Sequence, residues 1–381
     1  MEVYITGVGL TKVGRHFDLS LRELAARAAF EALDSARIDK VDAVVVASTL
    51  SYREAGQFDL AGHLAGALGL KGAQTLAMEA GDASGLAAVE AACSLIRAGS
   101  AERVLVVGVD KLTDYVSSRV YRDLQRLYEA EVQALYDIGH AGVAGLLARL
   151  YMERYGVGRD TLSYWPAMDH SHAKHNPYAM LPFAIDPAAV PRALKVAEPL
   201  TLLDSFPLGD GAAALVLESE PHGDARAKVV LATSAAGYPS FTMNEDPLAP
   251  ESVGEVAARL REVTGIAPAN VDVIELGDTF TSIGVILAES LGLSKPGRAA
   301  VDAMEGRFTL GGDGPVVNPS GGLKARGHPV GATGVYMVGE LALQLSGEYP
   351  GLRVDGARRG LAVMASGDGS SAHLVLVEGV A

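Results

Sequence analysis

The chain has 381 residues, of which 49% are hydrophobic and 20% are charged, so it can form one large or two medium domains with a sizeable core. A formal net charge of −14 leaves no basic field for nucleic acid and little attraction to anionic membrane surfaces. The single cysteine allows no intramolecular disulfide and is typical of a reducing compartment, so we expect a cytoplasmic protein.

The first part of the chain alternates short apolar runs with helical patterns. It begins with MEVYITGVGL, which has the pattern of a strand and lacks the basic start and cleavage site of a signal peptide. No apolar run approaches the roughly 20 residues that a membrane-spanning helix needs. The patterns predict strands at 3–9, 41–47, 74–79 and 103–109 and helices at 19–36, 59–70 and 84–98. This order predicts an α/β layered domain.

Residues 115–198 break that rhythm, because they hold most of the tyrosines and the only tryptophan, Trp165. We interpret them as an inserted, mostly helical lobe that lies over the functional site. A tight turn and a strand follow at 209–218, with the sequence GDGAAALVLE.

The second half of the chain echoes the first. ELAAR at 23–27 precedes VDAVV at 41–45, and EVAAR at 255–259 precedes VDVIE at 271–275. A helix at 281–291 and a strand-turn-strand at 361–377 complete the second copy. We therefore expect two duplicated βαβ-rich halves. Each half has few possible topologies, because crossovers between parallel strands are right-handed. The predicted units are an N-terminal half at 1–114 plus 199–222, the lobe at 115–198, and a C-terminal half at 223–381.

A glycine-rich run, NPSGGLKARGHPVGATG, occupies residues 318–334. Glycine adopts backbone angles that a Cβ forbids, so such a run can bring its peptide groups close to a ligand. His328 lies between Gly327 and Pro329, where little neighbouring bulk hides it, and an apolar helix from Val335 to Leu345 follows. A lone Gly-His-Pro would more simply be an exposed turn, but the whole run favours a loop that presents one imidazole to a substrate.

This run resembles the glycine-histidine-proline loop of the thiolase superfamily, in particular its archaeal and sterol-carrier-protein-x (lipid-transfer-protein) types. HSHAKHNPYA at 170–179 and the strand at 209–218 are similar to further segments of that family. The resemblance covers nearly the whole chain and implies a thiolase-like fold with α-β-α-β-α layers. It also implies acyl-CoA as substrate, no covalently bound cofactor, no metal, and a homodimer or dimer of dimers. By the same resemblance His328 lies beside the thioester, and the substrate-binding candidates are Asn318, Ser320, Gly321, Gly322, Gly327 and His170.

The catalytic positions depart from the family pattern. The family carries its nucleophilic cysteine in a C-x-S-G segment that opens a helix, where a thiolate is favoured. Here the matching segment begins with Asp82. Cys93 lies more than two turns inside the same helix and is interpreted as core. Asp82 can be read as a helix cap, as a general acid or base or, least favourably, as a nucleophile that would form an uphill mixed anhydride.

Two further positions also differ. The family's His-Asp-x-Phe segment matches Gly277 to Phe280, where Asp278 is retained and Thr279 occupies the place of a cysteine. The family's C-x-G turn matches Met364 to Gly369, which has no thiol. Tyr336 is the nearest tyrosine after the loop but has the position of a packing residue. The resemblance therefore leaves His328, Asp82, Asp278 and Thr279 as catalytic candidates.

Three functions fit these residues. The first is an enzyme of lipid metabolism that makes or breaks a C–C bond next to a CoA thioester, by aldolase-type or related acyltransferase chemistry, without a cysteine acyl-enzyme. His328 would then polarise the thioester and Asp82 would move the proton. The second is a non-catalytic thiolase-like subunit that works with an OB-fold, zinc-ribbon companion protein. The third is an ordinary acetyl-CoA C-acetyltransferase with unusual residues.

Overall fold

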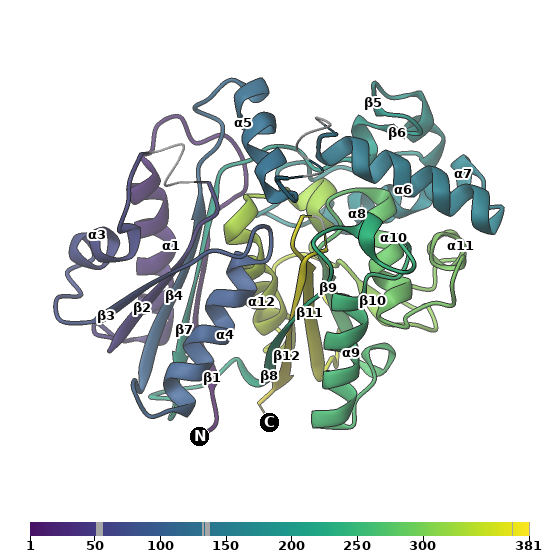
Figure 1. Ribbon diagram of the computed structural model, residues 1–381. Coiled ribbons are helices and arrows are strands. Elements are labelled where there is room, and N and C mark those ends of the chain that lie inside the picture. Colours follow the sequence, from purple (N-terminus) through teal and green to yellow (C-terminus); the bar gives the residue numbers. More distant parts are fainter. Residues whose placement is uncertain (51–55, 132, 134–137, 368, 381) are drawn as a thin grey trace.

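The structure is a computed structural model that describes residues 1–50, 56–131, 133, 138–367 and 369–380. Within them a mixed sheet runs in the order β10-β9-β11-β12-β8-β1-β7-β4-β2-β3 (Figure 1). The strands are β1 (Tyr4–Leu10), β2 (Ala43–Ala47), β3 (Gln74–Met78), β4 (Arg103–Asp110), β7 (Gly211–Glu218), β8 (Ala227–Ala236), β9 (Val273–Leu276), β10 (Val316–Val317), β11 (Arg359–Ala365) and β12 (Ser371–Gly379).

The sheet consists of two halves with the same topology. In the first, β2 pairs in parallel with β3 and β4, while β7 pairs antiparallel with β4 and β1. In the second, β9 pairs in parallel with β10 and β11, while β12 pairs antiparallel with β11 and β8. The halves join where Tyr4 and Ile5 of β1 pair with Lys228 and Ala227 of β8. The duplication expected from the sequence is therefore confirmed.

Helices form three layers around these halves (Figure 1). α1 (Leu21–Ala36) and α3 (Leu60–Ala67) cover the outer face of the first half, and α9 (Glu251–Thr264) packs on β8 and β12 of the second. α4 (Ser84–Arg97) and α12 (Thr333–Leu345) lie in the centre and contact strands of both halves. Alternate residues of β2 point to opposite faces of the sheet. Val44 and Val46 pack with α1 and α3, whereas Val45 packs in the central core. The predicted five-layer arrangement is thus present.

The lobe inserted between β4 and β7 is mostly helical, as expected. It packs against α10 (Thr281–Ser290) and α11 (Ala299–Met304) of the second half, so that these elements gather at one end of the molecule (Figure 1). No helix among the described residues is both long and apolar enough to cross a membrane. The lobe contains α5 (Ser117–Leu124), α6 (His140–Tyr155), α7 (Arg159–Leu162), α8 (Tyr164–Ala173) and a hairpin of β5 (Lys195–Ala197) and β6 (Leu200–Thr201).

The glycine-rich run at 318–334 is not an open loop. Residues Gly322–Arg326 form a π-helical turn, and every residue of the run is buried. The cause is close packing: a Cβ on Gly321 would lie 2.4 Å from the Cβ of Ala173 in the lobe, and a Cβ on Gly327 would lie 2.6 Å from Val13 Cγ1. The expectation that little bulk would hide His328 is therefore wrong, because distant segments enclose it.

Candidate active site

Two crossing helices bring the two strongest catalytic candidates together. α4 and α12 lie very close together near their N-terminal ends, where a Cβ on Gly85 would lie 2.6 Å from Val335 N and a Cβ on Gly334 would lie 2.3 Å from Leu86 N. Real Cβ atoms do not come that close, so this crossing requires glycine at both positions. Asp82 lies just before α4 and His328 lies just before α12. The crossing therefore places residues from the two halves of the chain in one site.

Asp82 and His328 form a buried hydrogen-bonded pair. His328 Nε2 lies 2.9 Å from Asp82 Oδ1, and both side chains are no more than 1% exposed. On the other side of the ring, His328 Nδ1 lies 2.7 Å from Thr333 Oγ1. If the Thr333 hydroxyl donates to Nδ1, a neutral imidazole carries its proton on Nε2 and donates it to Asp82. Asp82 Oδ2 has no hydrogen-bond partner among the described residues.

The environment favours an ionised Asp82. Burial opposes the charge, but the hydrogen bond with His328 leads the effects that outweigh it, with a smaller contribution from the backbone of Gly367, and the pKa of Asp82 lies below its usual value. Asp82 does not cap α4: the N-cap residue is Ala83, which makes no side-chain hydrogen bond, and Ser84 Oγ donates to Gly81 O instead. The helix-cap interpretation is therefore wrong, because the side chain of Asp82 contacts His328 instead.

A second imidazole, His140, belongs to this site and was not found from the sequence. It opens α6, and its ring centroid lies 5.1 Å from Tyr128, 5.6 Å from Phe206 and 5.3 Å from Phe280. Phe206 in turn contacts the ring of His328 at 4.9 Å between centroids. Burial lowers the pKa of His140 to about 4, so this ring is neutral at pH 7. The sequence contains no motif that would predict a contact between this histidine, at the start of a Gly/Ala-rich helix, and the site of Asp82 and His328.

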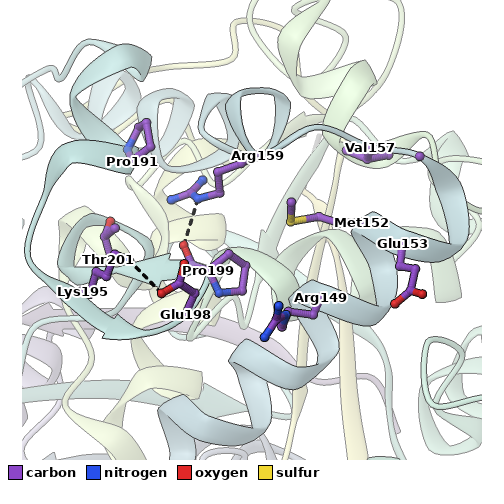
Figure 2. Close-up of a pocket in the computed structure, with 11 residues that line it drawn as sticks. Arg149, Met152, Glu153, Val157, Arg159, Pro191, Lys195, Glu198, Pro199 and Thr201 are labelled. Carbon is purple, nitrogen blue, oxygen red and sulfur yellow. Dashed lines mark hydrogen bonds and ion pairs between the residues drawn. The ribbon is translucent and has the colours of Figure 1, made fainter.

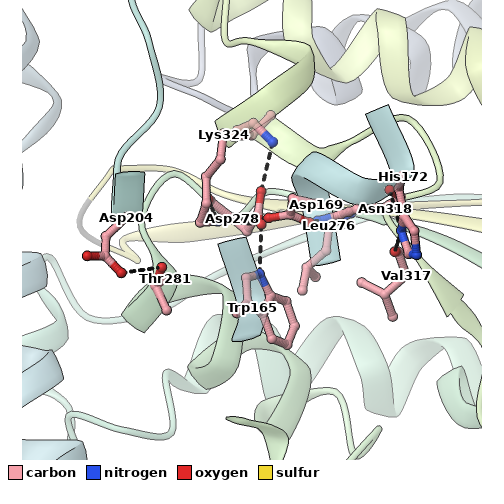
Figure 3. A network of polar contacts seen from close by, with 11 residues as sticks. Trp165, Asp169, His172, Asp204, Leu276, Asp278, Thr281, Val317, Asn318 and Lys324 are labelled. Carbon is pink, nitrogen blue, oxygen red and sulfur yellow. Dashed lines mark hydrogen bonds and ion pairs between the residues drawn. The ribbon is translucent and has the colours of Figure 1, made fainter. Parts of the chain in front are cut away.

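Asp278 lies in a different, fully buried network (Figure 3). Its Oδ2 accepts from Lys324 Nζ at 2.5 Å and from Trp165 Nε1 at 2.8 Å, and its Oδ1 accepts from the backbone of Leu323 at 2.8 Å. Lys324 Nζ also lies 3.2 Å from Asp169 Oδ2, and burial together with the Asp278 charge raises the pKa of Asp169 well above its usual value. Asp278 thus has donors on both oxygens and anchors the π-helical turn. Thr279 is 5% exposed, and its carbonyl accepts from Phe206 N at 3.1 Å.

The other predicted substrate-binding groups make contacts within the protein. Asn318 Oδ1 accepts from Leu276 N at 2.7 Å, and Ser320 Oγ donates to Glu275 Oε2 at 2.6 Å. His170 Nδ1 lies 3.0 Å from the carbonyl of Phe183. Gly321 and Gly327 are in van der Waals contact with other segments, and Gly322 lies against Asn318 and Asp169. The structure therefore brings only Asp82, among the sequence-predicted residues, into hydrogen-bond contact with His328.

Cys93 and Tyr336 have the packing positions expected for them. Cys93 is fully buried in α4, and burial raises the pKa of its thiol to about 12. The Tyr336 hydroxyl donates to Thr11 O at 2.8 Å, and burial raises the pKa of this phenol. Neither residue has the exposed, low-pKa character of a reactive nucleophile.

A cavity of about 780 Å³ lies within the lobe (Figure 2). Neither Asp82 nor His328 is among the residues that line it. Arg159 on its wall donates to the carbonyl of Pro199 at 3.0 Å and pairs with the buried carboxylate of Asp204. Lys195 and Glu198, which also line the cavity, form an ion pair at 2.8 Å. These cations are already paired with carboxylates of the protein. In the described part of the chain, no group of three or more His, Cys, Asp or Glu side chains is arranged to hold a metal ion.

Comparison with known proteins adds to this geometry. The family description "Thiolase, N-terminal domain" matches residues 3–221, and "Thiolase C-terminal domain-like" matches residues 234–379. The chain is 33% identical to an acetyl-CoA acetyltransferase of Methanocaldococcus jannaschii, with 90% of each chain covered. It is 31% identical to human sterol carrier protein 2, over 94% of this chain and 68% of that protein.

Among solved structures, the "Ltp2-ChsH2(DUF35) aldolase" has a TM-score of 0.83 and 22% sequence identity, with 99% of this chain and 98% of that chain covered. This likeness concerns the fold. The two family matches together span almost the entire sequence and agree with the duplicated halves described above. The chain therefore belongs to the thiolase superfamily.

Proposed function

We propose that this protein cleaves or forms the C–C bond between the α- and β-carbons of a 3-hydroxyacyl-CoA ester, by aldolase chemistry that uses the Asp82–His328 pair and no acyl-enzyme. The observation that carries the proposal is the buried 2.9 Å contact between Asp82 Oδ1 and His328 Nε2. The resemblance to thiolases assigns the position of Asp82 to the nucleophile of the family. An ionised carboxylate suits proton transfer, whereas its attack on a thioester would give an unfavourable mixed anhydride.

In the cleavage direction Asp82 accepts the proton of the β-hydroxyl group, through the oxygen Oδ2 that has no partner among the described residues. The O–H bonding electrons form the new carbonyl, and the Cα–Cβ bonding electrons move into the thioester as an enolate. His328 exchanges its hydrogen bond with Asp82 Oδ1 for one from Nε2–H to the thioester oxygen, where the negative charge develops. The proton on Asp82 then passes to the α-carbon, so that one 3-hydroxyacyl-CoA yields one acyl-CoA and one aldehyde or ketone.

The test is a cleavage assay of the pure full-length chain with 3-hydroxybutyryl-CoA and 3-hydroxy-3-phenylpropanoyl-CoA. The expected products are acetyl-CoA together with acetaldehyde or benzaldehyde. D82N removes the base and should lower kcat by about 100- to 10,000-fold. H328A should reduce kcat by a comparable factor because it removes the donor to the enolate. Variants that fold normally and retain full cleavage rates would overturn the proposal, as would a wild-type protein that cleaves neither ester.

A second candidate is a non-catalytic subunit that acts with an OB-fold, zinc-ribbon companion protein. It is favoured by the closure of the site, since Asp82, His140 and His328 are each no more than 6% exposed. The similar aldolase structure is named as a complex with a DUF35 protein, which agrees with a companion for this chain as well. Micromolar binding of a CoA ester and turnover by the pure chain would exclude this candidate. Analytical ultracentrifugation of the same sample tests the predicted homodimer.

A further inference from the structure

The aromatic residues beside the catalytic pair form a cage with a polar group at its centre. Tyr128, Phe206 and Phe280 surround the His140 ring, with centroids 5.1 to 5.6 Å from it. Phe206 contacts both imidazoles, because it lies 4.9 Å from His328 and 5.6 Å from His140. The cage and the Asp82–His328 pair are therefore parts of one continuous site.

The central imidazole lacks a partner that its burial would normally require. His140 is 6% exposed, and its Nδ1 makes no hydrogen bond to any described residue. Buried polar atoms in folded proteins are almost always hydrogen-bonded, so an unsatisfied one needs an explanation. His170 and His172 are buried in the same lobe, but their Nδ1 atoms have partners: the carbonyl oxygen of Phe183 lies 3.0 Å from the first, and those of Val317 and Asn318 lie 3.1 Å from the second. His172 Nε2, like His140 Nδ1, has no hydrogen-bond partner among the described residues.

The charge state of His140 suits an uncharged ligand. Burial favours the neutral ring, which has one N–H donor and one lone pair. A hydroxyl group can accept from the first or donate to the second, whereas a carboxylate would meet the apolar faces of Phe206 and Phe280 without a compensating charge. Among the described residues, those in ring contact with His140 are aromatic and bring no cation.

We propose that this cage is the binding subsite for the β-hydroxyl end of the substrate, and that His140 hydrogen-bonds the β-oxygen while Tyr128 and Phe280 pack against an apolar β-substituent. The inference rests on the proposed function and adds to it a substrate class: 3-hydroxyacyl-CoA esters whose β-substituent is uncharged and apolar. Asp82 would then receive the hydroxyl proton, and His140 would hold the oxygen in position for that transfer.

The test compares two ligands that differ only at the β-carbon. Calorimetry measures the dissociation constants of 3-hydroxybutyryl-CoA and butyryl-CoA for the full-length protein and for H140F, which fills the cage with another ring. The wild-type protein should bind the hydroxylated ester about tenfold more tightly, and H140F should lose this preference while its affinity for butyryl-CoA changes by less than about twofold. H140Q, which retains a donor and an acceptor, should recover part of the preference.

A matched control is H172F, which replaces an equally buried histidine of the same lobe. It should lower the melting temperature and leave the tenfold preference unchanged. A preference retained by both H140F and H140Q overturns the role of His140 but leaves the cleavage mechanism standing. A wild-type protein that cleaves 3-hydroxyacyl-CoA yet binds both esters equally overturns the role of His140 alone. If the wild-type protein binds neither ester, the proposed function fails and this inference fails with it.

Discussion

Thr333 Oγ1 lies 2.7 Å from His328 Nδ1, so a residue at the first turn of α12 orients the imidazole and, when its hydroxyl donates, keeps the ring proton on Nε2. T333V removes the hydroxyl and should lower the cleavage rate about tenfold through loss of one hydrogen bond, with little effect on KM. T333S retains the hydroxyl and should stay within about twofold of the wild type. Nitrogen NMR of the histidine ring should report a changed tautomer population in T333V alone. An unchanged spectrum and rate in T333V would show that Thr333 does not position the ring.

Replacing Asp82 with cysteine places a thiol directly before α4 and beside His328, the setting in which thiolates are activated. D82C incubated with acetyl-CoA should therefore release CoA and retain an acetyl group, detectable by mass spectrometry of the intact protein. The wild type should show no such adduct. D82A serves as the control for Cys93, whose burial should keep it unmodified. An acetyl adduct on the wild-type protein would instead support the acetyl-CoA C-acetyltransferase alternative.

Lys324 is the cation beside two acidic side chains in the buried network of Figure 3, with its Nζ 2.5 Å from Asp278 and 3.2 Å from Asp169. K324M leaves these carboxylates together without a cation and should reduce the free energy of unfolding by ~3–5 kcal/mol. Urea denaturation measures this loss. K295M, at an exposed lysine, should change it by less than about 0.5 kcal/mol. D278N in the K324M background should recover part of the loss, and an additive double variant would contradict the network.

A second buried cluster should make stability depend on pH. Burial raises the pKa of Glu275 to about 8 and that of Glu340 to about 7, although Arg326 opposes the shift. Between the usual glutamate pKa of 4.5 and these values, the native state holds protons that the unfolded state has released. Stability should therefore fall as the pH rises through this range, by up to ~1.4 kcal/mol per pH unit for each proton.

Thermal unfolding at several pH values from about 5 to 9 checks this sign. E275Q removes one titrating group, so its melting temperature should change less with pH than that of the wild type. E262Q, at an exposed glutamate, should follow the wild-type curve. A melting temperature that rises steadily over this range would contradict the assignment.

The fold could be predicted from the sequence because its strands and helices have strong local patterns. The apolar run that became β2 and the Ser20–Glu23 capping box at the start of α1 are signals contained within a few residues. The duplication was equally readable from the repeated ELAAR and EVAAR segments. In each case the pattern that predicts an element lies within a few consecutive residues, and the order of the elements then predicts how they pack in layers.

The site itself was only partly predictable, because its contacts join distant parts of the chain. The pairing of Asp82 with His328 spans 246 positions. Without that side-chain partner, the sequence left both a helix cap and a general acid or base open for Asp82. The burial of His328 depends on Val13 and on the lobe near Ala173, which pack against the glycines around it. His140 could not be identified as a site residue from the sequence, because its surroundings are formed by three aromatic residues that are distant in the chain, at positions 128, 206 and 280.

The crossing of α4 and α12 has a consequence for the origin of the molecule. The two helices hold corresponding places in the duplicated halves, and each half contributes one member of the Asp82–His328 pair. A half-length ancestor would therefore have possessed such a site only where two of its copies met, with glycines facing each other across the junction. Fusion of two copies allows each position to differ, and in this chain one half contributes the carboxylate and the other the imidazole.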